Sequence, residues 1–433
     1  MNNNYNSSNI EQLAKIPKNW KVVKWKYLSN EPMMYGANES AELDDRDLPR
    51  YIRITDLDSY GNLKDDTFKS LPFDKAKGYM LINGDILLAR SGATVGKAYI
   101  HKDDLDACFA GYLIRYRPNQ SKIKPQLVYY YTQTGLYADW IRENTIQATI
   151  QNVSAEKYAN LSMPVPPLEE QGNIVYFLDN KTSEIDSLIA DKEKLIELLE
   201  EKRQAIITEA VTKGLNPSVK MKDSGVEWIG EIPEHWEINK LKYLVYLRNE
   251  KVIDNYTLPY VGLENIESKT GNFNPSLGIE EQLVEGTSNA FYSGDVLFGK
   301  LRPYLAKCFV ANFEGKCTTE LLVMKTKENI ILNEYLKFLL LTDIYIQVIN
   351  SSTYGAKMPR ANWDFISNLL IPLPNIKEQM EIIKNVKNEI TTIDELREEL
   401  KLQIEKIKEY RQSLIYEAVT GKIDVREYKK VLS

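Results

Sequence analysis

The sequence has few cysteines and histidines and no long apolar run. It has three cysteines among 433 residues, without C-x-x-C spacing, which excludes a disulfide framework and a zinc knuckle. We expect Cys108 and Cys317 to be small buried side chains, and His101 and His235 to lie at the surface or in turns. No apolar run reaches roughly eighteen residues, and the polar N-terminus resembles no signal peptide. The sequence therefore predicts a cytoplasmic protein without a membrane partner.

Signatures of catalysis and cofactor binding are also missing. The segment at residues 92–98 resembles a P-loop, but it is one residue short, and Ala98 replaces the hydroxyl that would bind Mg²⁺. We find no G-x-S-x-G, H-E-x-x-H or G-x-G-x-x-G pattern. We therefore expect no catalytic residue, no metal ligand and no cofactor in this chain.

The chain also lacks a net positive charge. Its 55 Lys and Arg against 61 Asp and Glu give −6, which argues against a uniformly basic nucleic-acid coat. The charge is uneven: residues 1–165 have +2, residues 166–216 have −5, residues 217–372 have −3, and residues 373–433 are neutral. The largest share of the net negative charge thus lies in residues 166–216, so a localised basic face elsewhere is compatible with the total.

The chain contains two copies of one pattern. Ile-Pro-x-x-Trp occurs at residues 16–20 and 232–236, and Gly-Asp-Ile/Val-Leu begins at Gly84 and Gly294. Pro-x-x-x-Glu-Gln begins at Pro166 and Pro374. Between these motifs lie alternating strand patterns and a segment that predicts one helix, at residues 126–144 and 333–350. The sequence therefore predicts two similar globular units that mix helices and strands.

A long charged helix is predicted after each Glu-Gln. The first runs from Glu169 to about Thr212, and glycines at 214 and 421 fit the position that follows a helix end. Heptad-like spacing predicts a seam made of Leu178, Ile185, Leu188, Leu195, Leu199, Ile206, Val386, Ile393, Leu396, Leu400, Ile407 and Leu414. The two helices could form a coiled coil, parallel or antiparallel, or each could pack on its own globular unit, because periodicity does not identify the partner.

Two polar loops in each copy could contact nucleic acid. They lie at residues 90–97 and 145–152 of the first copy, and at residues 300–307 and 351–360 of the second. Arg, Gln and Asn can pair with base edges, whereas Lys, Ser and Thr suit phosphates. The predicted DNA-binding residues are Arg90, Ser91, Thr94, Lys97, Thr149, Gln151, Asn152, Lys300, Arg302, Tyr304, Lys307, Tyr354, Lys357 and Arg360.

The ordered and duplicated motifs resemble the specificity subunit of a type I restriction-modification enzyme. The resemblance includes the motifs above, the Arg-Gln…Glu-Ala-Val-Thr helix ends, and residues 225–230, and it covers nearly the whole chain. It implies an α+β fold in which two repeated α/β target recognition domains are separated by two long helices packed as an antiparallel coiled coil. The implied boundaries are 1–165 and 217–372 for the recognition domains, and 166–216 and 373–433 for the spacer helices.

The resemblance also implies a function without catalysis. Such a subunit reads a two-part asymmetric sequence in double-stranded DNA, and its helices set the gap between the two parts. It assembles with two methyltransferase subunits and two restriction/translocase subunits. S-adenosylmethionine, ATP and Mg²⁺ are then expected on those partners.

Two other functions remain to be tested against this one. A single-chain modification or restriction enzyme would show turnover by itself, although no catalytic constellation supports it. A coiled-coil adaptor that does not bind DNA would explain the helices but not two differing polar loops on one repeated frame. Such an adaptor would prefer no specific duplex over random duplex at moderate salt.

Overall fold

The chain forms two compact units that each combine segments distant in sequence. Unit 1 comprises Met1–Lys192 and Leu402–Ser433, and unit 2 comprises Glu193–Lys401. The computed structural model describes residues 5–10, 13–58, 61–102, 105–145, 152–253, 258–275, 287–355, 357–425 and 428. Each unit is described by itself below.

In the described part of unit 1, ten strands and four short α-helices precede the first long helix, α5. Its strands are β1 (Tyr5–Ile10), β2 (Leu13–Pro17), β3 (Lys21–Lys24), β4 (Met34–Tyr35), β5 (Arg50–Ile52), β6 (Ile86–Ala89), β7 (Ala98–Ile100), β8 (Ala107–Phe109), β9 (Leu113–Tyr116) and β10 (Ser162–Val165). Its short helices are α1 (Phe73–Ala76), α2 (Pro125–Tyr131), α3 (Gly135–Thr145) and α4 (Ala155–Asn160).

Unit 2 repeats this arrangement with extra strands. Its strands are β11 (Met221–Asp223), β12 (Glu231–Pro233), β13 (Glu237–Lys240), β14 (Val245–Arg248), β15 (Lys251–Ile253), β16 (Tyr260–Val261), β17 (Thr287–Phe291), β18 (Val296–Gly299), β19 (Cys308–Val310), β20 (Gly315–Cys317), β21 (Leu321–Thr326) and β22 (Leu370–Leu373). Its short helices are α6 (Leu241–Leu244), α7 (Asn333–Leu341), α8 (Asp343–Ser351) and α9 (Trp363–Ile366).

The same sheet lies at the centre of each unit. Its strand order is β4-β9-β6-β7 in unit 1 and β14-β21-β18-β19 in unit 2. The registers agree, because Leu88 pairs with Ile114 in one unit and Phe298 with Leu322 in the other. All residues of β6 and β18 are buried, as their continuous apolar sequences require. The predicted internal repeat is therefore a repeat of structure.

The prediction of a single helix at residues 126–144 and 333–350 is wrong in detail, because each segment forms two helices. Unit 1 has α2 and α3, and unit 2 has α7 and α8. In unit 2 the Thr342 side chain accepts a hydrogen bond from the Tyr345 backbone N–H, which caps α8. A hydroxyl that competes for backbone groups favours such a break, and an apolar periodicity does not reveal it.

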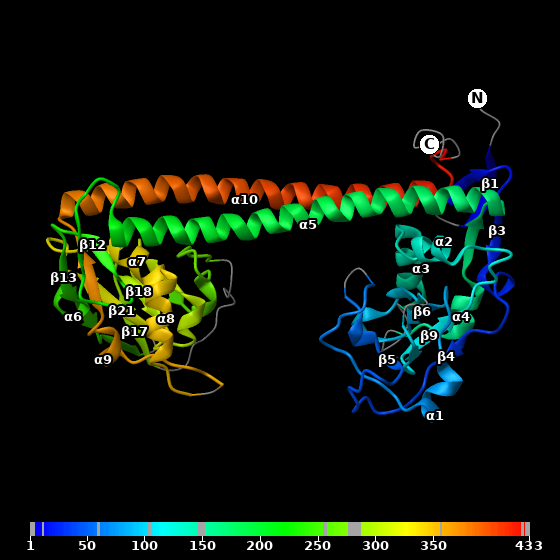
Figure 1. The fold of residues 1–433 in the computed structure, drawn as a ribbon, viewed down its shortest axis with the longest axis horizontal. Coiled ribbons are helices and arrows are strands. Elements are labelled where there is room, and N and C mark those ends of the chain that lie inside the picture. The colour runs from blue at the N-terminus through cyan, green and yellow to red at the C-terminus, as the bar shows by residue number, and fades with distance from the viewer. Residues whose placement is uncertain are drawn as a thin grey trace. The chain divides into compact units, whose positions relative to one another are not determined.

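Two long helices contribute to both units. Helix α5 is Leu168–Lys213 and helix α10 is Ile376–Val419, so each begins in one unit and ends in the other (Figure 1). Within unit 1, Asp186 bonds to Arg411, and Lys192, further along α5, bonds to Gln403, which comes earlier in α10. The helices are therefore antiparallel, as the family resemblance implied.

The buried face of these helices differs in part from the predicted seam. Leu178, Ile185, Val386, Ile393, Leu400 and Leu414 are buried, and Leu199, Ile206 and Ile407 are half-buried. Leu188, Leu195 and Leu396 are 44–46% exposed, so these three assignments are corrected. Polar residues also join the two helices: buried Arg203 pairs with Asp394 on α10, and Lys192 bonds to Gln403.

The core of each unit includes parts of the long helices. In unit 1, Leu178 and Ile415 share a cluster with Trp25 and Tyr116. In unit 2, Val211 and Ile382 share a cluster with residues of the central sheet. Each core therefore combines residues of one globular part with residues of both long helices. Helix α5 begins and ends within one residue of the predicted Glu169 and Thr212, whereas α10 ends at Val419, before the end of the spacer segment given as 373–433.

Candidate nucleic-acid interface

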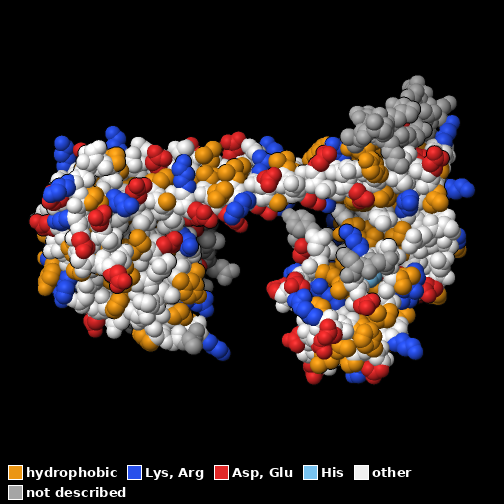
Figure 2. All heavy atoms as spheres, in the orientation of Figure 1, with side chains coloured by type: hydrophobic (Ala, Val, Ile, Leu, Met, Phe, Trp, Pro, Cys, Tyr) orange, Lys and Arg blue, Asp and Glu red, His pale blue; other side chains and the backbone are white. Residues whose placement is uncertain are grey.

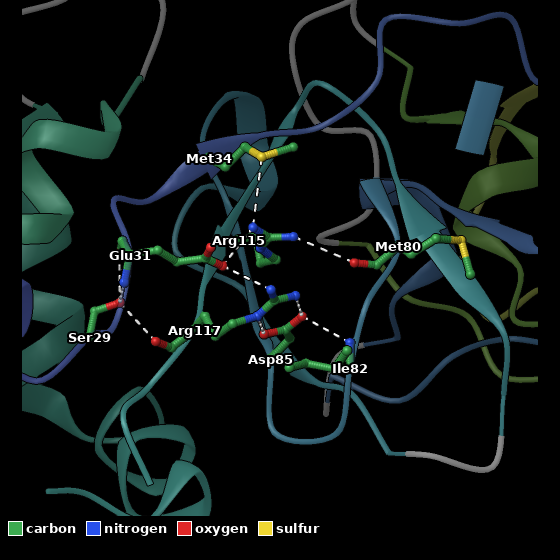
Figure 3. A network of polar contacts seen from close by, with 8 residues as sticks. All are labelled: Ser29, Glu31, Met34, Met80, Ile82, Asp85, Arg115 and Arg117. Carbon is green, nitrogen blue, oxygen red and sulfur yellow. Dashed lines mark hydrogen bonds and ion pairs between the residues drawn. The ribbon is translucent and has the colours of Figure 1, made fainter. Parts of the chain in front are cut away.

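The Gly-Asp motif forms a buried turn at the start of the central strand. In unit 1 the Asp85 carboxylate accepts the Ile82 backbone N–H at 3.0 Å and two hydrogen bonds from the Arg117 guanidinium at 2.6 Å. Arg117 and Arg115 both also contact Glu31, and Figure 3 shows this network. In unit 2, Asp295 also accepts the backbone N–H three residues before it, from Tyr292 at 2.9 Å, but its arginine comes from another strand: Arg248 of β14 donates through Nε at 2.7 Å. The motif therefore has a structural role.

The Glu-Gln motif fastens each long helix to the recognition part of its unit. The buried Gln171 amide accepts the Lys124 N–H at 2.8 Å and donates to the carbonyls of Lys122 and Pro166. Gln379 makes the same three bonds to Leu332, Ile330 and Pro374. These contacts explain why both copies have glutamine here, because its amide offers both an acceptor and donors.

The Ile-Pro-x-x-Trp motif packs against the end of a long helix. A Cβ added to Gly214 would lie 3.2 Å from the Trp236 ring, and one added to Gly421 would lie 3.2 Å from the Trp20 ring. Both glycines have a left-handed backbone, with φ of +75° and +70°. The prediction that glycines terminate the two helices is thus confirmed.

The two predicted loops of each copy lie together. In unit 1, Val153 N–H donates to the Arg90 carbonyl at 2.8 Å, and Ser91 forms an antiparallel bridge with Asn152. In unit 2, Ala361 N–H donates to the Lys300 carbonyl at 2.9 Å, and residues 301 and 360 form the matching bridge. Segments some sixty residues apart in sequence are therefore joined at the same edge of each unit.

A third segment joins this surface in both units. The Arg90 N–H donates to the Tyr112 carbonyl at 3.1 Å, and the Lys300 N–H donates to the Glu320 carbonyl at 3.0 Å. Shared backbone bonds define equivalent positions in the two units; at five of them on this surface the side chain differs, whereas Lys97 and Lys307 are the same. The differing pairs are Arg90 and Lys300, Ser91 and Leu301, Gly92 and Arg302, Tyr112 and Glu320, and Asn152 and Arg360.

The surface of unit 1 includes two tyrosines that sequence reasoning missed. The Arg90 guanidinium lies over the Tyr35 ring at 4.8 Å, and Tyr112 is 64% exposed. Stacking on an aromatic ring orients a guanidinium, and Arg90 Nη1 also donates to the Gly111 carbonyl at 3.5 Å. Neither tyrosine belongs to a predicted loop, and only the fold brings it there. Of the other predicted residues, Ser91 and Thr94 are half-buried, and Asn152 is exposed.

The surface of unit 2 also has exposed aromatic and basic groups. Tyr304 and Tyr354 are 45% and 64% exposed, and Arg302 and Lys357 are exposed. Arg360 pairs with Glu320, and this hydrogen bond raises the pKa of the Arg360 guanidinium. The guanidinium of Arg360 is thus engaged within the unit.

Two predicted DNA-binding lysines are engaged with the backbone of their own unit. The Lys97 ammonium donates to the Asp58 carbonyl at 3.2 Å, and the Lys307 ammonium donates to the Leu263 carbonyl at 2.7 Å. Both are half-buried, and burial lowers the pKa of Lys307. We therefore assign them to loop positioning. Thr149 and Gln151, also predicted to bind DNA, lie outside the described residues.

The described residues hold no group of His, Cys, Asp and Glu suited to a metal ion, and none of their helices could cross a membrane. Cys108, Cys308 and Cys317 are buried, and burial raises the pKa of each thiol to about 12. The expectation for the matched Cys108 and Cys317 is confirmed. The expectation for His101 is wrong, because its side chain is buried, whereas His235 is exposed beside Glu378.

Charge alone does not mark the candidate surfaces. In the view of Figure 2, Lys and Arg side chains are interspersed with Asp and Glu on both units. This agrees with the near balance of charged residues in the sequence. The surfaces are distinguished by repeated backbone geometry and by differing side chains.

Comparisons with known proteins point to one family. A family model described as a type I restriction modification DNA specificity domain matches residues 2–198 and 233–406. The specificity subunit of the type I restriction enzyme MjaVIII, from Methanocaldococcus jannaschii, is 25% identical over 440 residues, covering 98% of this chain and 97% of that protein. The EcoDI specificity subunit from Escherichia coli is 23% identical over 355 residues, covering 78% of each.

Two solved structures share the fold. One comes from work on complex assembly and conformational transition of the type I R-M system, with a TM-score of 0.70, 15% identity, and coverage of 94% of this chain and 99% of that one. The other is the HsdS subunit from Thermoanaerobacter tengcongensis, with a TM-score of 0.53, 16% identity, and coverage of 95% and 100%.

Proposed function

Since the chain belongs to the type I restriction modification DNA specificity family, we propose that it is the DNA-reading subunit of a restriction-modification complex. Unit 1 reads one half of a two-part asymmetric sequence in double-stranded DNA, and unit 2 reads the other half. The reading residues are those of the two loop surfaces, with Arg90 and Asn152 in unit 1 and Arg302, Tyr354 and Lys357 in unit 2.

The observation that supports this proposal is the contrast between frame and surface. Buried positions such as Asp85 and Asp295 are the same in the two units, and each accepts the backbone N–H three residues before it. At five surface positions that shared backbone bonds make equivalent, the two units have different side chains. A common scaffold with differing exposed groups is what two readers of different sequences require, since specificity comes from contacts with base edges.

The chemistry belongs to partner subunits in this proposal. Two methyltransferase subunits supply S-adenosylmethionine-dependent methylation, and two restriction/translocase subunits use ATP and Mg²⁺. The chain itself has no catalytic residue and no cofactor; it supplies recognition and a scaffold. In support, the sequence has no Walker motif or dinucleotide loop, and all three thiols are buried with raised pKa.

A selection from random DNA duplexes tests the function. The full chain, bound to its methyltransferase partner, is incubated with the pool at moderate salt, and the retained duplexes are sequenced. We expect a two-part motif with a gap of fixed length. An adaptor without DNA recognition would enrich no motif, because only salt-dependent, sequence-independent binding would remain. A single-chain enzyme would methylate or cleave DNA when given S-adenosylmethionine and Mg²⁺ without any partner.

A further inference from the structure

One arginine on the surface of unit 2 has a backbone conformation that disfavours side chains. Arg302 has φ of +50° and ψ of +59°, in the left-handed region. The equivalent residue of unit 1 is Gly92, with φ of +76°. The path of the loop therefore requires a left-handed residue in both units, and glycine alone adopts it without strain. Unit 2 nevertheless has a large side chain there.

The backbone on both sides holds this conformation in place. The Arg302 N–H donates to the Pro359 carbonyl at 2.7 Å, and the Arg302 carbonyl accepts the Leu305 N–H at 2.9 Å. The side chain is exposed, and among the described residues its guanidinium has no hydrogen-bond or ion-pair partner. Contacts within the described part of the chain therefore do not account for an arginine at a strained position. Strain of this kind is typical of residues kept for function.

A carboxylate of this surface, that of Glu320, is paired with another arginine. Glu320 accepts two contacts of 3.2 Å from the Arg360 Nε, one on each oxygen. The Arg302 guanidinium therefore keeps its full set of donors for an external partner. Tyr304, two residues further along, is also exposed, so the arginine stands on an open surface.

The difference between the units indicates what that partner is. A phosphate contact carries no sequence information, so two DNA readers on one frame would be expected to share it. Unit 1 has a glycine at this position and can make no such side-chain contact. A base contact, in contrast, should differ between units that read different half-sites. Guanine is the base that arginine binds most often, through two hydrogen bonds to O6 and N7.

We propose that Arg302 determines specificity by reading a guanine in the half-site bound by unit 2. This inference rests on the proposed function, and it assigns one residue, Arg302, to one base, a guanine, in the half-site that unit 2 reads. It also predicts an opposition between stability and recognition, because the side chain that reads the base strains the loop that carries it.

The test compares three variants with the full chain, each bound to its methyltransferase partner and applied to the random duplex pool. Arg302→Gly is expected to lower the preference for guanine at one position of one half-site by about 10- to 100-fold, leaving the other half-site unchanged. Its unfolding Tm should stay unchanged or rise by about 2 °C, since the strain is removed. Arg302→Lys keeps the charge but not the two-pronged donor geometry, and it should not restore the preference.

The matched control is Ala306→Gly. Ala306 is the second left-handed residue of the same loop, with φ of +47°, and its counterpart Gly96 is a glycine. This variant relieves the same kind of strain but removes no donor, so its motif should equal that of the unchanged chain. The inference is overturned if Arg302→Gly leaves the motif intact. It is also overturned if affinity falls equally for all duplexes and Arg302→Lys restores it, which would indicate a phosphate contact. If the unchanged chain selects no motif, the proposed function itself fails.

Discussion

Arg411 on α10 makes a two-pronged ion pair with Asp186 on α5, at 2.8 and 3.1 Å, and also donates to Gln133 at 2.9 Å. The pair recurs in unit 2 with the roles of the helices exchanged. Arg203 on α5 pairs with Asp394 on α10 and donates to the Thr270 carbonyl. In each unit, therefore, one arginine joins the two long helices to the recognition part.

The ion pairs Arg203–Asp394 and Arg411–Asp186 should differ in their contribution to stability. The Arg203 side chain is 1% exposed, whereas the Arg411 side chain is 18% exposed and its partner Asp186 is 48% exposed. We expect Asp394→Asn to lower the free energy of unfolding of unit 2 by about 3 kcal/mol, because it leaves a buried charge unpaired. The matched change Asp186→Asn should lower that of unit 1 by at most about 1 kcal/mol, because solvent screens the pair. Amide hydrogen exchange measures each unit separately; equal losses in both units would contradict this prediction.

Gln171 and Gln379, the buried glutamines of the two Glu-Gln motifs, should contribute equally to the stability of their units. Gln379→Ala leaves the Leu332 N–H and the carbonyls of Ile330 and Pro374 without their partner, so unit 2 should lose about 2–4 kcal/mol of unfolding free energy. Gln171→Ala should have the same effect on unit 1. The control is Gln412→Ala on the exposed face of α10, for which a change within about 0.5 kcal/mol is expected. The loss of unfolding free energy is measured by denaturant titration with hydrogen exchange as the probe. If Gln379→Ala lost no more than Gln412→Ala, the stabilising role of Gln379 would be disproved.

All three thiols should be inert in the folded chain. Burial raises the pKa of Cys108, Cys308 and Cys317 to about 12, so at pH 8 the reactive thiolate is a very small fraction and is also shielded. Iodoacetamide at pH 8 should label none of them until denaturant is added, and all three afterwards. Mass spectrometry of the labelled peptides measures this, and rapid labelling of any one in the folded chain would show that its burial is wrong.

Sequence reasoning recovers what repeats and misses what depends on tertiary contact. The repeat, the long helices and their glycine ends follow from spacing alone, because local chemistry determines them. The seam register does not follow, since the pattern of leucines includes exposed Leu188 and omits buried Arg203. A buried arginine enters the seam only because Asp394 and the Thr270 carbonyl satisfy it, and sequence periodicity contains no sign of such partners.

The sequence predicted which loops form the candidate surface, but not all of the side chains that the surface contains. Tyr35 and Tyr112 lie outside the predicted loops, and strand pairing brings them to Arg90. Conversely, Lys97 has the residue type that suits phosphate, but its ammonium is engaged with a backbone carbonyl. Residue type therefore indicates which groups could contact DNA, and the fold decides which of them are free to do so.

The length of the paired helices should set the gap between the two half-sites. Insertion of seven residues into both α5 and α10, after Lys192 and after Lys401, keeps the phase of the seam because a heptad is two turns. Each insertion adds roughly 10 Å of helix, equivalent to about three base pairs of duplex. Duplex selection should then return both half-sites unchanged with a gap about three base pairs longer. The control inserts four residues into α5 alone, which moves the apolar residues of α5 out of register with those of α10. It should lower the free energy of unfolding and give no new defined gap between the half-sites. If the seven-residue insertions altered a half-site or left the gap unchanged, the helices would not act as the spacer, because recognition and spacing would then reside in the same elements.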